Sequence, residues 1–452
     1  MSTPATVTNL HLTTTNRQIL SIALPISFSI FIPQINFITN NIFLGQLGEE
    51  SLAAAGITGV YYLIFAVLGF GLNNGLQALI ARRAGQDRIL EIGKLFAQGI
   101  YISMAFAVMS ILITYLLAPG ILGFALSSGE MTNKCLQFLR IRIWGLPFLY
   151  IYQMRNALLV GTNQSKLLVW GTLAETLTNI ILDYALIYGH FGLPELGFNG
   201  AAIASVIAEF TGMFIVFMVI EWKGISRKLS LYKNLRFNWP VCRLILDQSS
   251  PLIFQYAISI ISWEFFYILI EHYGARDLAI SNTMRNIFGI FGVFTWSFAA
   301  TCTTMVSNII GQGLSHQVPA LIRRIVRLSF LISTSLCILL NIFPNLVLSL
   351  FGQDEEFIRL AIPAMRVVSV ALVMMSFATV WLNAVTGTGN SRVNLGIEVI
   401  AIIAYSIFVY FVLRVYKLPI AIGWMAEWVY WSILFTLSFA YIKSGKWQGK
   451  EI

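Results

Sequence analysis

The sequence predicts an all-α integral membrane protein, with twelve transmembrane helices arranged as two six-helix repeats. The first observation is composition: of 452 residues, 57% are hydrophobic and 11% are charged, with a mean hydropathy of +0.77. A soluble domain carries roughly 25% charged residues, so this chain must lie in lipid. The second is a series of apolar runs, each long enough to cross a bilayer. The third is an internal repeat at a constant offset.

The apolar runs are bounded by Gly, Pro, Asn and charged residues, which mark the ends of the spans. We place the spans near residues 18–43, 53–82, 94–119, 135–160, 166–189, 198–221, 245–271, 279–310, 321–350, 357–386, 393–414 and 419–442. The expected regions are an N-terminus (1–17), an N-terminal six-helix lobe (18–221), a linker (222–244), a C-terminal six-helix lobe (245–442) and a tail (443–452).

The basic residues are divided unevenly between the two sides of the predicted membrane. Odd-numbered linkers between spans hold five Lys or Arg residues, whereas even-numbered linkers and the termini hold nineteen. Because Lys and Arg accumulate in cytoplasmic loops, we expect a multi-pass cell-membrane protein with both termini in the cytoplasm. The bacterial inner membrane is the expected location. Topology thus explains the net charge of +9, and the sequence indicates no basic groove for nucleic acid.

The sequence lacks the motifs of an enzyme or of an ATP-driven pump. It has no Walker phosphate loop, no HExxH motif and no serine nucleophile motif. The four Cys and the four His residues have no metal-binding spacing. We therefore expect no catalytic residues and no cofactor, and an ion gradient is the energy source that remains.

The internal repeat aligns residues 25–166 with residues 251–392 at an offset of 226 and without a gap. At its end, GTNQSK (161–166) falls on GTGNSR (387–392). A constant offset over 142 residues argues for a duplication. Six helices per copy give both copies the same direction across the membrane, and transporters built this way bind substrate between their halves.

The stretch AETLTNIILDY (174–184) places Glu175, Asn179 and Asp183 at four-residue steps within an apolar run. On a helix these side chains lie along one face, where ionisable groups in a membrane are candidates for function. Their counterparts in the second copy are Ala401, Tyr405 and Val409. Because the second copy lacks the stripe, the fold does not require it, and a cation or proton site is the better explanation.

Four segments and the GTGNSR turn carry the residue patterns of a known family, at matching places among the predicted helices. The segments are ALPISFSIFIPQINFITNNIFLGQLGEESLAAAGI (23–57), GLQALIARRAGQ (75–86), NIILDYALIYGHFGLPELGFNGAA (179–202) and VSNIIGQGL (306–314). With these, the chain resembles the multidrug and toxic compound extrusion (MATE) family over essentially its whole length. The resemblance implies a V-shaped antiporter, expected as a monomer in the bilayer, that exports small organic compounds, often cationic or amphipathic.

The DinF-like branch of that family carries a Na⁺ or H⁺ site, formed by an Asp on the first helix with an Asn and an Asp on the fifth. Here Asn179 and Asp183 match the fifth-helix pair and would be the sodium ligands if sodium is the coupling ion. The first-helix position falls on Asn40, which departs from the usual Asp and cannot take up a proton. Glu175 is the candidate for the missing charge, and Ser205 for the sixth-helix hydroxyl that often completes the site.

Further polar residues in the spans are candidates for substrate binding or coupling. Asn36 and Gln34 lie on the first predicted helix, where a role in helix packing is the alternative. Glu264 lies near the middle of the seventh, and some family members use an acid on that helix. For Glu264 the alternative is an ion pair with Arg285 on the eighth helix.

Two other functions remain open at this stage. A flippase for a lipid-linked saccharide from the wider superfamily would be expected to line its cavity with several Arg residues. Five Arg residues do fall within the spans, namely Arg140, Arg142, Arg155, Arg285 and Arg366. A passive channel has no supporting filter motif.

Overall fold

The computed structural model describes residues 10–126, 128–233, 235–349, 351 and 354–450, and within them the regular elements are helices. The outermost residues of the predicted N-terminus and tail lie outside this range. The first copy contains α1 (Asn16–Gln46), α2 (Glu49–Gly85), α3 (Ile89–Ala125), α4 (Gly129–Arg142), η1 (Ile143–Gly145), α5 (Leu146–Gly161), η2 (Ser165–Leu167), α6 (Leu168–Tyr188) and α7 (Gly197–Trp222). After α8 (Ile225–Lys228), the second copy contains α9 (Trp239–Glu271), α10 (Ala275–Gly311), η3 (Ser315–Gln317), α11 (Val318–Ile342), α12 (Pro344–Ser349), α13 (Glu355–Gly387), α14 (Ser391–Val409), η4 (Tyr410–Val415), α15 (Ile420–Gly423) and α16 (Ala426–Lys443).

Ten helices in the described part of the chain are long and apolar enough to cross a membrane. The other two predicted spans correspond to α4–η1–α5 and to α6. The first is interrupted by the 3₁₀ turn Ile143–Gly145, and the second carries the polar stripe that lowers its mean hydropathy. The predicted all-α membrane class is confirmed.

The chain divides into two compact units. The amino-terminal unit comprises Phe28–Ile80 and Ile89–Ile253, and the carboxy-terminal unit comprises Met1–Ser27, Ala81–Arg88 and Phe254–Ile452. The division falls inside α1 and inside α9, at positions separated by 226 residues, which is the offset of the repeat. The first half of the first helix in each copy therefore packs with the other copy's helices.

Specific contacts hold these two half-helices in place. In the carboxy-terminal unit, Ser27 of α1 and Ser297 of α10 share a hydrogen bond of 2.6 Å. In the amino-terminal unit, a Cβ on Gly71 of α2 would lie 2.7 Å from the backbone N of Ile253 in α9. Ser27 corresponds to Ile253, and Ser297 to Gly71, so the two contacts are related by the repeat.

The end of α2 crosses α10 within the carboxy-terminal unit, and the crossing is also related by the repeat. A Cβ on Gly85 would meet the carbonyl of Asn308, and a Cβ on Gly311 would meet the carbonyl of Arg82. Because the nearest atoms are backbone, a side chain at either glycine would force the helices apart. Gly85 corresponds to Gly311 and Arg82 to Asn308, so each copy supplies one glycine and one carbonyl.

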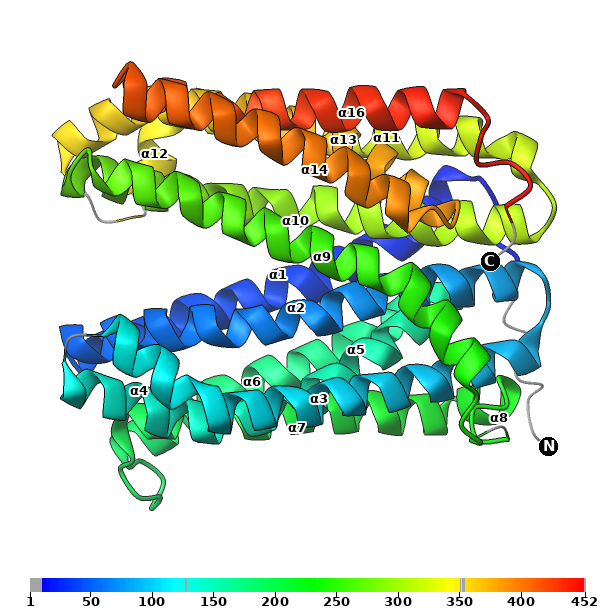
Figure 1. The fold of residues 1–452 in the computed structure, drawn as a ribbon, viewed down its shortest axis with the longest axis horizontal. Helices are drawn as coiled ribbons and strands as arrows, with labels where there is room; N and C mark the ends of the chain where they lie inside the picture. The colour runs from blue at the N-terminus through cyan, green and yellow to red at the C-terminus, as the bar shows by residue number, and fades with distance from the viewer. Residues whose placement is uncertain (1–9, 127, 234, 350, 352–353, 451–452) are drawn as a thin grey trace. The chain divides into compact units, whose positions relative to one another are not determined.

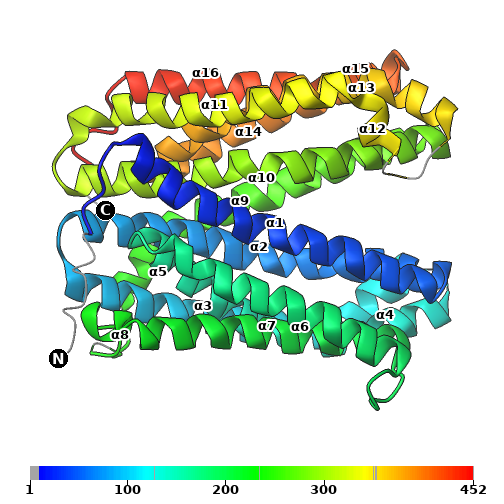
Figure 2. The ribbon, with the colours of Figure 1, turned by 180° about the vertical axis from the view of Figure 1, so that it is seen from behind.

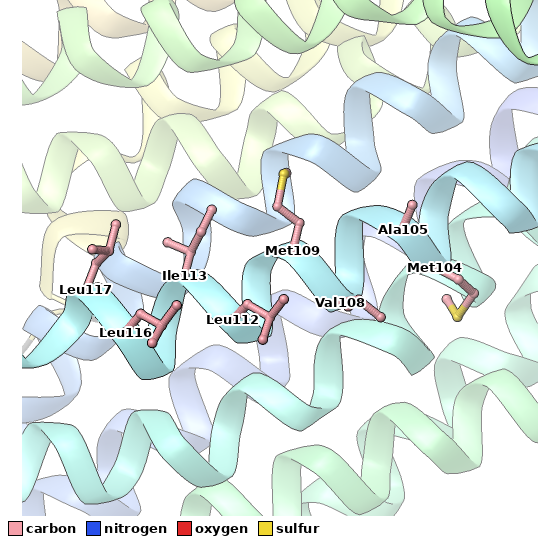
Figure 3. A pocket seen from close by; sticks show the side chains of 8 residues that line it. All are labelled: Met104, Ala105, Val108, Met109, Leu112, Ile113, Leu116 and Leu117. Atoms are coloured by element: carbon pink, nitrogen blue, oxygen red, sulfur yellow. The ribbon is translucent and has the colours of Figure 1, made fainter.

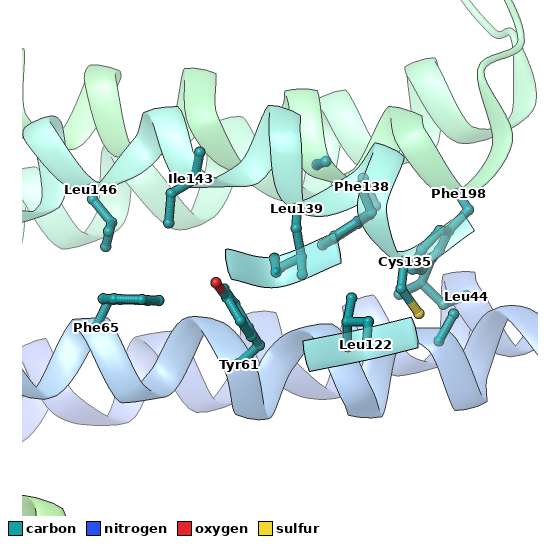
Figure 4. Packing of buried hydrophobic residues seen from close by; sticks show 14 of the residues in the cluster. Leu44, Tyr61, Phe65, Leu122, Cys135, Phe138, Leu139, Ile143, Leu146 and Phe198 are labelled. Atoms are coloured by element: carbon teal, nitrogen blue, oxygen red, sulfur yellow. The ribbon is translucent and has the colours of Figure 1, made fainter. Parts of the chain in front are cut away.

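The amino-terminal unit is built around α6 and α7, which pack along each other, and around α3, α5 and α7 (Figure 1). One part of its core brings Tyr61 and Phe65 of α2 against Leu139, Ile143 and other buried side chains of the α4–α5 region (Figure 4). This packing fixes the helices that carry the polar side chains described below.

The carboxy-terminal unit has α10 and α13 at its centre, with α11 and α16 packed on α13 and α14 packed on α16 (Figure 2). Phe266, Phe298 and Trp424 are among its largest fully buried side chains. Burying such rings supplies much of the packing energy in a core, so this unit has its own stable interior.

Candidate functional site

The polar stripe on α6 is buried inside the amino-terminal unit. The side chain of Asp183 is completely buried, and that of Asn179 is 2% exposed. Glu175, one turn earlier, is half-buried. The four-residue steps of the sequence place all three on one helical face, as predicted.

Helix α1 lies beside this face and contributes two amides. Asn36 donates its Nδ2–H to Oδ1 of Asn179 at 2.6 Å. Further along, the hydroxyl of Tyr188 donates to the carbonyl of Phe43 at 2.7 Å. These two contacts show that α1 and α6 run in the same direction, so Asn40, one turn beyond Asn36, comes level with Asp183.

Several oxygen atoms of this cluster receive no hydrogen bond. Both carboxylate oxygens of Asp183 and the Oδ1 atoms of Asn36 and Asn40 are buried and have no hydrogen-bond partner among the described residues. The Nδ2 group of Asn179 is likewise buried and unpaired. A buried polar group without a partner costs about 1–3 kcal/mol, and more when it is charged. Four such oxygens fit a proton or a hard cation, since both bind oxygen ligands.

Helix α7 lies antiparallel against α6 and brings Ser205 to the cluster's level. A Cβ on Gly200 would lie 2.6 Å from the carbonyl of Leu186, and one on Gly212 would lie 2.8 Å from Oε2 of Glu175. Ser205 falls between these crossings, level with the stretch from Asn179 to Asp183. Its side chain is half-buried.

A second acid on α7, Glu209, is neutralised by a network that the sequence did not reveal. Arg142 donates to both carboxylate oxygens of Glu209, at 2.6 and 2.8 Å. The hydroxyl of Tyr62 donates to the same carboxylate at 3.0 Å, and its ring lies 3.8 Å from the guanidinium carbon. One signal lies in the sequence: AEF (208–210) matches AEW (426–428) in the second copy, at an offset eight residues shorter, so Glu209 and Glu427 are equivalent.

Glu175 differs from Glu209 in having no such partner. It lies against Gly212, and it has no hydrogen bond or ion pair with the described residues. The nearby Arg142 already binds Glu209 through two nitrogens. Glu175 is therefore an acid whose charge is not balanced by a direct contact.

The other predicted residues lie apart from this network. Gln34 is half-buried on α1, one and a half turns from Asn40. In the carboxy-terminal unit, Glu264 is exposed on α9, and the guanidinium of Arg285 on α10 lies 5.2 Å from the centre of the Tyr267 ring. No ion pair joins Glu264 to Arg285 in the described part of the chain.

The carboxy-terminal unit contains its own buried acid, Glu398 on α14, which is completely buried. Three side chains donate to it: Gln255 at 3.2 Å, Ser259 at 2.7 Å, and Tyr430 through a short hydrogen bond. Glu427 nearby on α16 accepts from the indole of Trp263 at 3.2 Å. These acids are held by neutral donors.

One hollow lies along α3, and its lining is apolar. It measures about 640 Å³ and is lined by eight apolar side chains between Met104 and Leu117 (Figure 3). All eight come from one helix, and most are exposed. A surface of this kind suits lipid tails or the apolar part of a compound, and not an ion.

Comparisons with known proteins identify the family. A family model described as MatE matches residues 25–185 and 251–412, so each copy of the repeat matches separately, and the two matches begin 226 residues apart. The chain is 23% identical over 446 residues to "Probable multidrug resistance protein NorM" of Thermotoga maritima, covering 96% of this chain and 94% of that protein. It is also 23% identical to "Multidrug resistance protein MdtK" of Cronobacter sakazakii, covering 86% of this chain and 85% of that protein.

Solved structures share the fold. An outward-facing multidrug resistance MATE family transporter of the MOP superfamily superposes with a TM-score of 0.87 at 18% identity, covering 98% of each chain. A MOP superfamily transporter from Pyrococcus furiosus superposes with a TM-score of 0.86 at 19% identity, covering 98% of this chain and 99% of that one. The family model spans most of the sequence, and the fold agrees over nearly all of it. The chain therefore belongs to the MatE family and is a multi-pass membrane transporter, not an enzyme.

Proposed function

We propose that the protein is a secondary active antiporter that exports organic, often cationic or amphipathic, compounds and is driven by a Na⁺ or H⁺ gradient. The observation that carries this proposal is the buried Asp183. Its two carboxylate oxygens, like the Oδ1 atoms of Asn36 and Asn40, have no hydrogen-bond partner among the described residues. The names of the relatives support the substrate class, since they describe multidrug resistance proteins.

The same geometry suits either coupling ion, in different ways. A proton bound to Asp183 removes the buried charge and gives a hydroxyl that can donate to Oδ1 of Asn40. A sodium ion would instead be held by Asp183, with amide oxygens as further ligands. Asn179 joins that set only if it turns its amide, because its Oδ1 now accepts from Asn36. In both cases Glu175 is the second acid and Ser205 a further oxygen.

The alternative of a lipid-linked saccharide flippase gains no support from Arg140 and Arg142 of the amino-terminal unit. Arg142 is bound by both carboxylate oxygens of Glu209, and Arg140 is exposed on α4. The relatives named above are drug-resistance proteins. Membership of the DinF-like branch stays a prediction, and it rests on Asn179 and Asp183.

The test is export from proteoliposomes of the full chain loaded with a fluorescent organic cation such as ethidium. One arm imposes a sodium gradient at fixed pH, and the other a pH gradient without sodium. We expect one of the two gradients to drive release well above that of protein-free vesicles. Release that is equal with and without a gradient would show a passive pathway, and no release in either arm would reject export of organic cations.

We also propose that both termini face the cytoplasm and that a monomer is the active form. The distribution of Lys and Arg among the linkers supports the orientation. A reporter enzyme that folds only outside the cytoplasm, fused to the C-terminus, should be inactive, whereas the same reporter in the α3–α4 loop should be active. The opposite pattern would reverse the topology.

A further inference from the structure

A second cavity, of about 240 Å³, lies in the amino-terminal unit where α3, α5 and α7 meet the linker that follows α7. It is separate from the Asp183 cluster and is not used by the proposed transport mechanism. Apolar and aromatic side chains form most of its wall, and Arg155 of α5 is its one charged residue. The linker contributes Leu231, Tyr232 and Leu235.

The linker is held firmly over this cavity by α3. The buried amide of Gln98 donates to the carbonyl of Arg236 and accepts from the backbone N–H of Asn238, both at 3.0 Å. The hydroxyl of Tyr101 donates to the carbonyl of Leu235 at 2.5 Å. The cavity is therefore preformed, because the side chains of Gln98 and Tyr101 on α3 fix the linker backbone that covers it.

The polar part of the wall combines one cation with two hydroxyl groups. One guanidinium nitrogen of Arg155 donates to the carbonyl of Met213 at 2.5 Å, and the group lies 5.0 Å from the centre of the Phe217 ring. Its other N–H groups have no hydrogen bond to the described residues. The acid close enough to interact with Arg155 is Glu221, and its carboxylate accepts from Tyr232 at 2.6 Å and from Ser226 at 2.7 Å.

Tyr232 adds no negative charge to this wall. Burial, together with the hydrogen bond to Glu221, raises the pKa of Tyr232 to about 12, so it stays a neutral phenol at physiological pH. Among the described residues, the acid that interacts with Arg155 is then Glu221, whose oxygens already accept from two hydroxyl groups. The remaining guanidinium N–H groups are the strongest donors in the cavity.

The linker has the composition of a membrane–water boundary. Residues 222–244 contain six Lys or Arg residues and no Asp or Glu. Its exposed aromatic side chains are Trp222, Tyr232, Phe237 and Trp239, between 52% and 81% exposed. Exposed aromatic rings beside clustered basic residues are typical of the level at which lipid head groups lie.

We infer that this cavity binds one anionic phospholipid, with the phosphate at Arg155 and the start of an acyl chain over Phe96, Ile100 and Phe217. A phosphate suits the free N–H groups of a guanidinium, and the surrounding basic residues favour an anion. The apolar wall explains why a lipid is favoured over free phosphate, which would leave most of the surface without a partner. The lipid would tie the linker to α3 and α7.

Native mass spectrometry of the purified full chain tests this inference. The protein is incubated with dioleoyl phosphatidylglycerol, with dioleoyl phosphatidylcholine, or with glycerol 3-phosphate. We expect one phosphatidylglycerol per chain to be retained, with a preference of about tenfold over phosphatidylcholine, as a charge-assisted contact provides. Equal retention of the two lipids would overturn the proposal. Binding of glycerol 3-phosphate as tightly as phosphatidylglycerol would also overturn it, because it would show a site for free phosphate.

Two variants remove the site in different ways. Arg155→Ala deletes the cation, and Ala97→Phe fills the cavity while leaving Arg155 in place. Both should lose the preferential phosphatidylglycerol, and Ala97→Phe decides the matter if Arg155→Ala fails to fold. The matched control is Arg140→Ala, an exposed arginine on α4 that does not line the cavity, which should retain the lipid. Retention by Ala97→Phe would contradict the inference.

Discussion

Asp183 and Glu398 are both completely buried carboxylates, and they lie on equivalent helices of the two repeats. Glu398 accepts from three side chains, whereas neither oxygen of Asp183 accepts from any described residue. Burial alone therefore does not distinguish a structural acid from a functional one. The hydrogen-bond donors around each acid do distinguish them. A carboxylate that accepts hydrogen bonds stabilises its surroundings, whereas one that accepts none needs an ion or a proton.

The repeat sharpens this comparison. The positions equivalent to Asn179 and Asp183 are Tyr405 and Val409, which are buried in the carboxy-terminal unit. Glu398 corresponds to Thr172, whose hydroxyl shares a hydrogen bond of 2.8 Å with that of Tyr152. The fold thus accepts apolar residues where Asp183 lies and a neutral hydroxyl where Glu398 lies, so neither acid is needed to form the helix.

The largest effect is expected from Asp183→Asn. Export of the organic cation should fall to the level of protein-free vesicles, because an amide cannot exchange a proton and binds sodium weakly. The thermal unfolding midpoint in detergent should not fall, since the substitution removes a buried charge that has no partner. Initial rates of efflux measure export, and the thermal unfolding midpoint measures stability. A variant that exports like wild type would place the coupling elsewhere.

Glu398→Ala should show the opposite pattern. Removing the acceptor leaves the donors of Gln255 and Tyr430 unpaired around a small cavity, which should cost about 2–5 kcal/mol of stability. The midpoint should therefore drop by several degrees, while the folded fraction still exports. Glu398→Gln is the control, since its amide keeps an acceptor oxygen and should lose less. Complete loss of export by the fully folded Gln variant would make Glu398 part of the coupling site.

A smaller effect is expected where the amino-terminal acids are exchanged. If Glu175 supplies the second charge, Glu175→Gln should reduce export several-fold, and adding Asn40→Asp should restore much of it. Asn40 is level with Asp183, so the new carboxylate joins the same cluster. The measurement is the initial rate of export of each variant, under the ion gradient that drives export by the wild type. Unchanged export in Glu175→Gln would leave Asp183 as the only acid needed.

The smallest effect concerns an acid outside the membrane spans. Asp354 caps α13 by accepting from the backbone N–H of Phe357 at 2.7 Å, and it pairs with Arg276 at 2.8 Å. The cap and the guanidinium hold the pKa of Asp354 below its usual value. Its contribution to stability is thus present at neutral pH and is lost as pH falls below about 4.

The matching measurement compares thermal midpoints of wild type and Asp354→Ala at pH 7 and at pH 3.5. The difference between the two proteins should shrink at the lower pH, because pH 3.5 lies below the usual pKa of an aspartate and the contribution of the carboxylate is already partly lost there. Export should not change at pH 7. A constant difference across this range would show that the carboxylate's charge contributes nothing.

Much of the fold was accessible from the sequence because hydrophobic runs and a constant repeat offset are local or periodic signals. The stripe on α6 followed from four-residue spacing. The sequence did not predict that the first halves of α1 and α9 pack with helices of the other copy. This packing depends on contacts between residues far apart in sequence, such as Ser27 with Ser297. The helices also run past the predicted spans, as α2 does at Glu49–Gly85 against 53–82, because they continue beyond the hydrocarbon.

The partners of the polar residues were the least predictable part of the site. Arg142, Glu209 and Tyr62 come from three helices, and no spacing rule joins them. The ion pair with Arg285, which was the alternative interpretation of Glu264, is not formed among the described residues, where Arg285 lies over the Tyr267 ring. Sequence spacing locates residues on a helical face, whereas the choice of neighbour depends on how helices pack.

The central claim is that the coupling ion binds at Asp183 and not at Glu398. A ligand that binds the folded protein raises its unfolding midpoint, so the most direct measurement is this midpoint as a function of sodium concentration and of pH. We expect the ion that drives export to raise the unfolding midpoints of wild type and Glu398→Gln equally. The midpoint of Asp183→Asn should not depend on that ion. An unchanged ion dependence in Asp183→Asn, or its loss in Glu398→Gln alone, would contradict the account.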